Sequence, residues 1–313
     1  MPLLRYVAYR SLQLFPVLIG ITLIAFILLR ILPGDPATLM LGARGTAEDI
    51  ARLKAQLGLD RPLWEQYLAF LWDMASGSLG QSIAYRRPVA EVILGRLPAS
   101  LVLVAYSTVL AVAMTFPLAI LAALRKDRGV DMAIKGIFVV AMSMPSFWLG
   151  ILLILLLSVH LELFPVSGYG SGLWDRLRHL FLPAFVIALS TSALTIRSLR
   201  SSILGVLKAD YVDTARAKGL RGGTVMARHV LRNSLISMVS VLAVHTSWVI
   251  GGTVVIEAVF AIPGLGYLLV NSIYARDYPL IQGLTVTFAV LVVLINLLTD
   301  VAYALIDPRV RYE

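Results

Sequence analysis

The chain has 313 residues, of which 59% are hydrophobic and 14% are charged. Soluble proteins carry about 25% charged residues, so this composition, with a mean hydropathy of +0.85, excludes a soluble globular protein and predicts an integral membrane protein. The net charge of +9 does not indicate a nucleic-acid partner, because membrane topology explains where the basic residues fall. The lack of cysteine excludes disulfides and thiolate metal sites.

Six apolar segments are long enough to cross a bilayer, which takes roughly 20 residues. They are Leu12–Leu32, Ser100–Leu124, Ile134–Val159, Leu182–Leu204, Leu235–Val259 and Leu280–Leu305. The first follows basic residues, as a signal peptide does, but it is longer than a signal h-region and lacks a small-x-small cleavage site. We therefore expect it to remain as a span, in an all-α, polytopic membrane protein with six transmembrane helices.

The segment Pro33–Pro98 separates the first two predicted spans and carries helix signals of its own. Thr46 and Asp49 have capping-box spacing ahead of an apolar-periodic run. Pro62 opens a second amphipathic run that ends near Gly77. We expect a helical insertion that packs on the spans rather than a disordered loop.

Lysine and arginine are concentrated in alternate short loops, and such loops stay in the cytoplasm. The short loops on the opposite side hold only Arg176, Arg178 and Arg276. Both termini and the loop Leu204–Asn233 are therefore expected in the cytoplasm, and the insertion outside it. The chain then divides into an N-terminal segment with the first span (1–32), an extracytoplasmic insertion (33–98) and a core domain (99–313).

A short polar helix is predicted within Asp210–Gly219, between the fourth and fifth spans. Asp210 can cap its first turn, Asp213 takes the capping-box position, and Gly219 can end it in the left-handed conformation. Small residues that would let another protein surface approach are Ala215, Ala217 and Gly219. We expect a docking site for a cytoplasmic partner; an ordinary solvated basic loop is the alternative.

The fifth span is broken near its outer end by a proline and two glycines. Irregular backbone at membrane depth is tolerated where protein or water covers it, so this bend is expected to line a translocation path or to pack beneath the insertion. Glu257 serves either the bend, as a hydrogen-bond acceptor, or the path. Six spans offer few polar residues for a wide pore, so we expect the path at an interface with a second bundle. The candidate lining residues are Thr246, Ser247, Thr253, Glu257, Pro263, Gly264 and Gly266.

Other polar residues of the spans are assigned structural roles. Asn296 and Asp300 lie four residues apart on one face of the last span, where they are expected to hold helices together rather than to relay protons. Arg197 and Arg200 are expected to snorkel towards the cytoplasmic surface. No histidine has metal-ligand spacing, and no phosphate loop or nucleophile motif is present. We therefore expect no catalytic, cofactor-binding or metal-binding residues.

Short motifs run in order along nearly the whole chain. They are Arg10–Gly20, Leu32–Pro36, Leu57–Leu63, Arg87–Val89, Ser143–Trp148, Asp210–Gly219, Arg232–Asn233, Val255–Gly266, Arg276–Pro279 and Asp307–Arg309. As a set they resemble the permease subunits of the dipeptide, oligopeptide and nickel group of ABC importers. Asp213, Ala215 and Gly219 fill the acidic-x-Ala-x-x-x-Gly pattern of that group's EAA loop. The chain departs from the pattern at Thr214, in place of the first alanine, and at Ser237, in place of a proline often found after the loop.

The resemblance implies a type I ABC-importer permease fold and a non-enzymatic subunit of the bacterial inner membrane. Its implied partners are a second permease, two cytoplasmic ATPases that bind ATP and Mg, and an extracytoplasmic binding protein. It assigns the ATPase contact to Asp213, Thr214, Ala215, Ala217 and Gly219. Short peptides are the expected cargo, with nickel or a nickel chelate as the alternative. An ion-coupled secondary transporter is the alternative of another class, which would use charges such as Glu257 and show inverted repeats.

Overall fold

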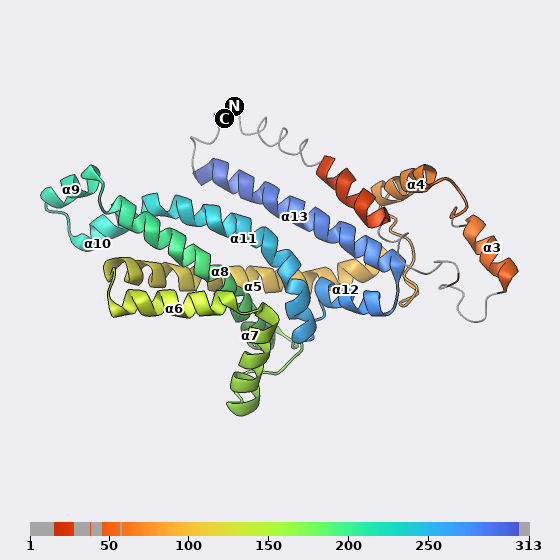
Figure 1. Cartoon of the computed structure of the whole chain (residues 1–313), viewed down its shortest axis with the longest axis horizontal. Coiled ribbons are helices and arrows are strands. Elements are labelled where there is room, and N and C mark those ends of the chain that lie inside the picture. Colours follow the sequence, from red (N-terminus) through yellow and green to blue (C-terminus); the bar gives the residue numbers. More distant parts are fainter. Residues whose placement is uncertain (1–15, 28–37, 39–45, 57, 307–313) are drawn as a thin grey trace.

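The computed structural model describes residues 16–27, 38, 46–56 and 58–306, and within these ranges regular structure is helical apart from one isolated bridge between Gln81 and Pro88. The helices are Pro16–Ile27, α3 (Ala47–Gln56), α4 (Leu63–Ala75), α5 (Val89–Leu124), α6 (Gly129–Ser143), α7 (Ser146–Leu153), η2 (Ile154–His160), α8 (Leu173–Val206), α9 (Asp210–Ala217), α10 (Gly222–Thr224), η3 (Val225–Leu231), α11 (Arg232–Val259), α12 (Leu265–Tyr274) and α13 (Tyr278–Ile306). They form an elongated bundle with α9 and α10 at one end and α3 and α4 at the other (Figure 1).

The all-helical, multi-span architecture is confirmed, but the number of spans is not clearly six. Among the residues that the structure describes, α5, α8 and α13 are each long and apolar enough to cross a membrane. A fourth span results if α6 and the α7–η2 helix are counted as one bent crossing. The described apolar parts of the first and fifth predicted spans, Pro16–Ile27 and Val249–Val259, are shorter.

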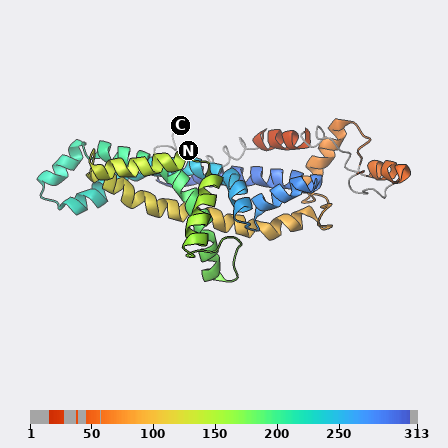
Figure 2. The same cartoon turned by 60° about the horizontal axis from the view of Figure 1, so that its bottom comes forward.

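The predicted span Ile134–Val159 is not one straight helix. The two halves meet at 108°, between Ser143 and Ser146. Pro145 has no amide hydrogen to donate and pushes the residue before it out of the helical region; Met144 accordingly has φ −89° and ψ 139°. The helix α7–η2 therefore projects from the side of the bundle in both views (Figures 1 and 2).

Two helices begin earlier in the chain than their predicted spans. The helix α5 begins at Val89, after Pro88, and so includes Pro98, where the insertion was expected to end. The helix α8 begins at Leu173 rather than at Leu182. Both exceed the roughly 20 residues that a bilayer requires, with 36 and 34 residues respectively. The apolar pattern therefore marks the spanning part of each helix and not its full length.

Two helix signals in the insertion are confirmed. At the start of α3, the Asp49 amide donates to the Thr46 hydroxyl over 3.2 Å, and the Thr46 amide donates to the Asp49 carboxylate over 3.2 Å, which is a capping box. The Thr46 hydroxyl and amide hold the pKa of the Asp49 carboxyl below its usual value, because both donate to it. The α4 helix follows Pro62 as expected, and its Tyr67 hydroxyl lies 3.0 Å from the Ile19 carbonyl oxygen, which joins the insertion to the first helix.

The central helix is α8, which packs along α5 and α11. Buried apolar residues form three clusters at successive positions along the bundle. One cluster joins α5, α6 and α8 to α9 and η3; the second joins α5, α8 and α11; the third joins the start of α5 to α12 and α13. The predicted docking helix therefore packs in the first of these clusters, and the helices on either side of the predicted bend pack in the second and third.

Candidate functional site: a docking helix and a clamped bend

The predicted docking helix is present as α9, but its start differs from the expectation. The residue that precedes the helix is Ala209, and no side chain caps the first turn, so the prediction that Asp210 is the cap is wrong. Asp210 and Asp213 instead both lie in the first turn. Carboxylates are favoured there because the amide ends of the peptide dipoles point towards them.

The predicted end of α9 is confirmed. Gly219 has φ +76°, its amide donates to the Arg216 carbonyl over 2.9 Å, and the Leu220 amide donates to the Ala215 carbonyl over 3.3 Å. These two bonds define a Schellman motif, in which the left-handed residue is usually glycine because a side chain there is strained. An added Cβ at Gly219 would meet no atom of this chain within 4 Å. The constraint on Gly219 within the chain is therefore its backbone conformation and not space.

The α9 helix has one buried and one exposed face. Val212 and Ala215 are 0% and 5% exposed, in the core cluster that also contains Ile203 of α8. The predicted contact residues on the outer face are Asp213, Thr214, Ala217 and Gly219, all exposed. Ala215 thus faces this chain's own core. It can affect a partner contact only by setting how far α9 stands from the core helices on which it packs. The α9 helix lies at one end of the bundle (Figure 1).

The bend after α11 is held by a buried carboxylate. Glu257 is 0% exposed and accepts hydrogen bonds from the Gly266 amide over 2.7 Å and the Tyr267 amide over 3.2 Å. Its other oxygen accepts from the Ser100 hydroxyl of α5 over 2.6 Å, while the Ser100 oxygen accepts from the Leu265 amide over 2.7 Å. The first three amides of α12 are therefore satisfied by two side chains of other helices. Of the two roles open to Glu257, the structure supports acceptor for the bend.

The glycines of the bend allow this close approach. A Cβ added at Gly264 would collide with the Glu257 carboxylate and the Ser100 hydroxyl, and one added at Gly266 would collide with the Val254 backbone. Both glycines are buried, and Pro263 between the helices is partly buried. These three predicted residues are therefore brought together with Glu257, as expected for a compact bend.

The remaining predicted lining residues are placed less directly. Thr253 is 1% exposed and donates to the Ile250 carbonyl over 2.8 Å, so its contacts lie within this chain. Thr246 and Ser247 belong to α11, but their side chains lie outside the described part of the structure, as does the side chain of Asp300 in α13. The lining of a path by these residues stays a prediction.

A second buried carboxylate, Asp277, was missed from the sequence. It is 0% exposed, accepts from the Leu280 amide over 3.2 Å at the start of α13, and accepts from the Ala84 amide over 3.0 Å. The Ser82 hydroxyl also donates to it. Asp277 therefore fastens the segment before α5 to the turn between α12 and α13. An aspartate two residues before a proline at a helix start was a visible capping signal.

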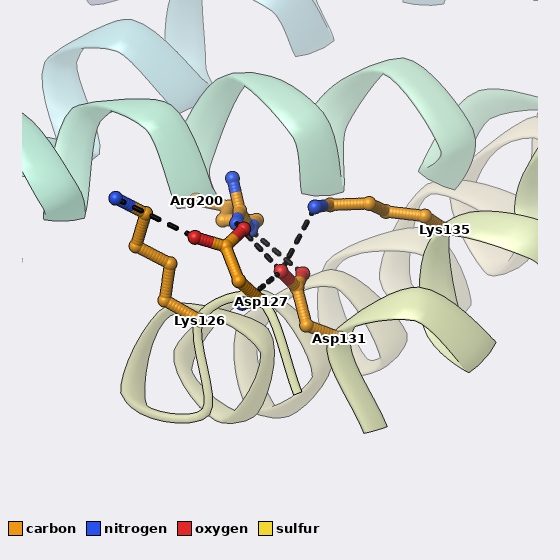
Figure 3. Close-up of polar contacts among 5 residues, drawn as sticks. All are labelled: Lys126, Asp127, Asp131, Lys135 and Arg200. Carbon is orange, nitrogen blue, oxygen red and sulfur yellow. Dashed lines mark hydrogen bonds and ion pairs between the residues drawn. The ribbon is translucent and has the colours of Figure 1, made fainter. Parts of the chain in front are cut away.

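An ion-pair cluster between α6 and α8 was also missed (Figure 3). Arg200 was expected to snorkel towards the membrane surface, and this expectation is wrong. It makes two hydrogen bonds to Asp131, from Nε over 2.8 Å and from Nη2 over 2.6 Å. Asp131 on the adjacent helix is buried, and a buried carboxylate needs a paired cation, which Arg200 supplies. Arg197, one turn earlier on α8, is exposed, which is consistent with the expectation for that residue.

The comparison with protein families covers almost the whole chain. Residues 115–312 match the family described as binding-protein-dependent transport system inner membrane component, and residues 3–104 match its N-terminal family. The chain belongs to this family. Membership makes it a multi-pass permease subunit of the inner membrane that is not itself catalytic and needs no cofactor, and it implies a binding protein and ATPase subunits as partners.

Curated relatives extend over the full length. The chain is 41% identical to the oligopeptide transport system permease protein AppB of Bacillus subtilis, over 98% of this chain and 99% of that protein. It is 37% identical to the dipeptide transport system permease protein DppB of Escherichia coli K12, over 99% of this chain and 100% of that protein. These similarities confirm the resemblance stated on the sequence motifs.

Solved structures agree in fold at low sequence identity. A chain of the MetNI methionine ABC transporter, in an inward-facing conformation, superposes with a TM-score of 0.58 at 15% identity, over 69% of this chain and 96% of that one. A chain of an amino acid ABC transporter solved with histidines gives 0.51 at 14% identity, over 68% and 93% of the two chains. These likenesses show the fold alone.

Proposed function

We propose that this chain forms one half of the translocation path of an ATP-driven importer for short peptides. The observation that carries this proposal is identity of 41% and 37%, over nearly full length, to permeases named for oligopeptide and dipeptide transport. Nickel or a nickel chelate remains the other cargo within the same group, and no described residue of the bend favours it. Both termini and α9 lie in the cytoplasm in this proposal, and the insertion lies outside.

The exposed face of α9 is the proposed ATPase contact, within the loop Leu204–Asn233. Three features support it: the helix has an ordered end, its apolar face is fixed in the core, and its exposed face includes the short side chains of Thr214 and Ala217. Because its apolar face is packed in the core, a force that a partner applies to α9 passes to the helices on which α9 packs. Basic residues around it, such as Arg216 and Arg221, favour an acidic groove on the partner.

We infer a contact with a second permease from the exposed surface of α11. Val255 of α11 is 45% exposed, whereas Thr253 and Ile256 of the same helix are each 1% exposed. One side of α11 is therefore not covered by its own chain. In the membrane, either lipid or a second bundle can cover that surface. A peptide-sized path needs the second bundle, because the core of this chain is filled by its own side chains.

Cargo uptake by the reconstituted complex tests the proposal. The chain would be placed in proteoliposomes with the second permease, the ATPases and the binding protein, and loaded with labelled di- and oligopeptides or with a nickel chelate. ATP-dependent accumulation of peptide supports the proposal. Accumulation of nickel alone would replace the cargo, and accumulation driven by an ion gradient without ATP would replace the class of transporter.

A further inference from the structure

The Asp131–Arg200 pair joins two helices at the end of the bundle that carries α9. Asp131 lies in the first turn of α6 and is 0% exposed, and the side chain of Arg200 on α8 is 16% exposed. The guanidinium donates in a fork to both carboxylate oxygens, over 2.8 and 2.6 Å. Such a bidentate pair fixes both distance and direction between the two side chains.

Two further donors complete the coordination of Asp131. The Lys135 ammonium lies 2.8 Å from one carboxylate oxygen, and the Asp127 backbone amide donates to the same oxygen over 2.9 Å. Asp127 has φ +58° at the turn between α5 and α6, so this bond also holds the turn. Its own side chain forms an exposed rim with Lys126, 3.7 Å apart, and lies 3.9 Å from Arg200 (Figure 3).

The energetics of this cluster favour a positional role. A buried ion pair is weak evidence for stability, because desolvation of the two charges offsets much of their attraction. Apolar packing between α6 and α8 would hold the helices together but would tolerate small sliding, whereas a bidentate fork does not. What the pair adds to the apolar cluster around it is therefore a fixed register between α6 and α8.

The position of α9 follows that of α8, because the connection between these two helices is hydrogen-bonded. Only Leu207, Lys208 and Ala209 separate α8 from α9, and their amides donate to the carbonyls of Ile203, Gly205 and Val206. Val212 of α9 packs in the same cluster as Ile134 of α6 and Ile203 of α8. A displacement of α9 is thus carried by α8, and through Arg200 and Asp131 to the α5–α6 turn.

We propose that the Asp131–Arg200 pair is a positioning latch, which makes the α5–α6 turn and the cytoplasmic part of α8 move as one body when the ATPase displaces α9. The inference rests on the proposed function, in which α9 receives the ATPase stroke. The pair is assigned a positioning role and not a part in binding cargo or nucleotide. Without the latch, α8 slips on α6, and ATP is hydrolysed with less transport.

The test exploits the absence of cysteine from the chain. In the full reconstituted transporter, D131C combined with R200C removes the pair, and a short bifunctional methanethiosulfonate reagent then joins α6 to α8 again. The measured quantity is peptide translocated per ATP hydrolysed. We expect a fall of about five- to tenfold in the unlinked double variant, in the range typical of coupling between sites, and recovery after cross-linking but not after a monofunctional reagent.

Two outcomes would overturn the latch. One is an unchanged ratio of peptide to ATP in the unlinked variant. The other is no recovery on cross-linking, and a cross-linked complex that hydrolyses ATP but transports nothing would mean that the pair must open. If the double variant does not assemble, R200K replaces it, because lysine keeps the charge but not the fork; R200K should lower the ratio, and a ratio equal to wild type overturns the latch.

The matched control is R197K, an exposed arginine one turn away on the same helix, which should leave the ratio unchanged. ATPase co-purification separates this inference from the proposed function. Latch variants should retain the bound ATPase. Retention of the ATPase by a variant with a disrupted α9 would instead count against the proposed function itself.

Discussion

Ser100 of α5 and Glu257 of α11 are hydrogen-bonded to each other over 2.6 Å and together accept the first three amides of α12. The two residues lie 157 positions apart in the chain and join three helices at the bend between α11 and α12. A carboxylate at that position is matched to amide donors on one oxygen and to a hydroxyl donor on the other. The bend is therefore held by hydrogen bonds and not only by the breaking effect of Pro263.

The substitution E257Q should destabilise the bend. Glutamine keeps the shape but replaces one acceptor oxygen by an NH₂ group, which faces either the α12 amides or the Ser100 hydroxyl. Loss of a buried bond to a charged group costs about 1–3 kcal/mol, so thermal unfolding in detergent should begin at lower temperature. The control E162Q, at an exposed glutamate outside the helices, should unfold as wild type does. Full stability with loss of transport in E257Q would assign Glu257 to the path instead.

The substitution G219D should abolish transport and lower ATPase co-purification. Its side chain is strained at φ +76°, and its carboxylate lies on the face proposed to meet the partner. The matched control is G77D: Gly77 has φ +81°, ends α4 with the same kind of hydrogen bonds, and also has no atom within 4 Å of an added Cβ. Equal effects of the two variants would show that strain alone, and not the position on α9, causes the loss.

A cysteine at Glu48 should react with an impermeant thiol reagent added outside intact cells. The Glu48 side chain is 82% exposed in the insertion, and the chain has no cysteine of its own to react. A cysteine at the exposed Lys218, directly after α9, should react only after the membrane is opened. Labelling of E48C from the cytoplasmic side alone would reverse the proposed orientation of the whole chain.

The substitution D277A should release the segment before α5. It removes the acceptor for the Leu280 and Ala84 amides and for the Ser82 hydroxyl, including the cap of α13, which alone is worth about 1 kcal/mol. Trypsin should then cleave faster after the nearby exposed Arg86, whereas the bond after Arg87 precedes Pro88 and resists trypsin. The control D73A alters an exposed aspartate of α4 and should leave the cleavage rate unchanged. An unaltered rate in D277A would mean that other contacts hold the segment.

Signals that act within one turn of chain were readable from the sequence. The capping box of Thr46 and Asp49 and the left-handed end at Gly219 both depend on residues at most five positions apart, and the structure confirms both. Pro145 was equally visible, but the apolar pattern continues on both sides of it and masked a 108° break. Hydropathy reports that a segment prefers lipid and not whether it runs straight.

Contacts between distant helices were not readable in the same way. Asp131 and Arg200 are 69 residues apart, and the sequence does not state that α6 lies beside α8. Arg200 was therefore assigned to the membrane surface, which is the default for a basic residue near the end of a span. The same limit applies to Glu257, for which the sequence left two roles open until Ser100 was placed beside it.

Uptake of labelled peptide by proteoliposomes with and without the second permease tests the central claim most directly. The ATPases, the binding protein and this chain would be present in both preparations. The account predicts ATP-dependent accumulation only when both permeases are present, because this chain supplies half of the path. Equal accumulation with this chain as the sole permease would contradict a path formed between two different subunits.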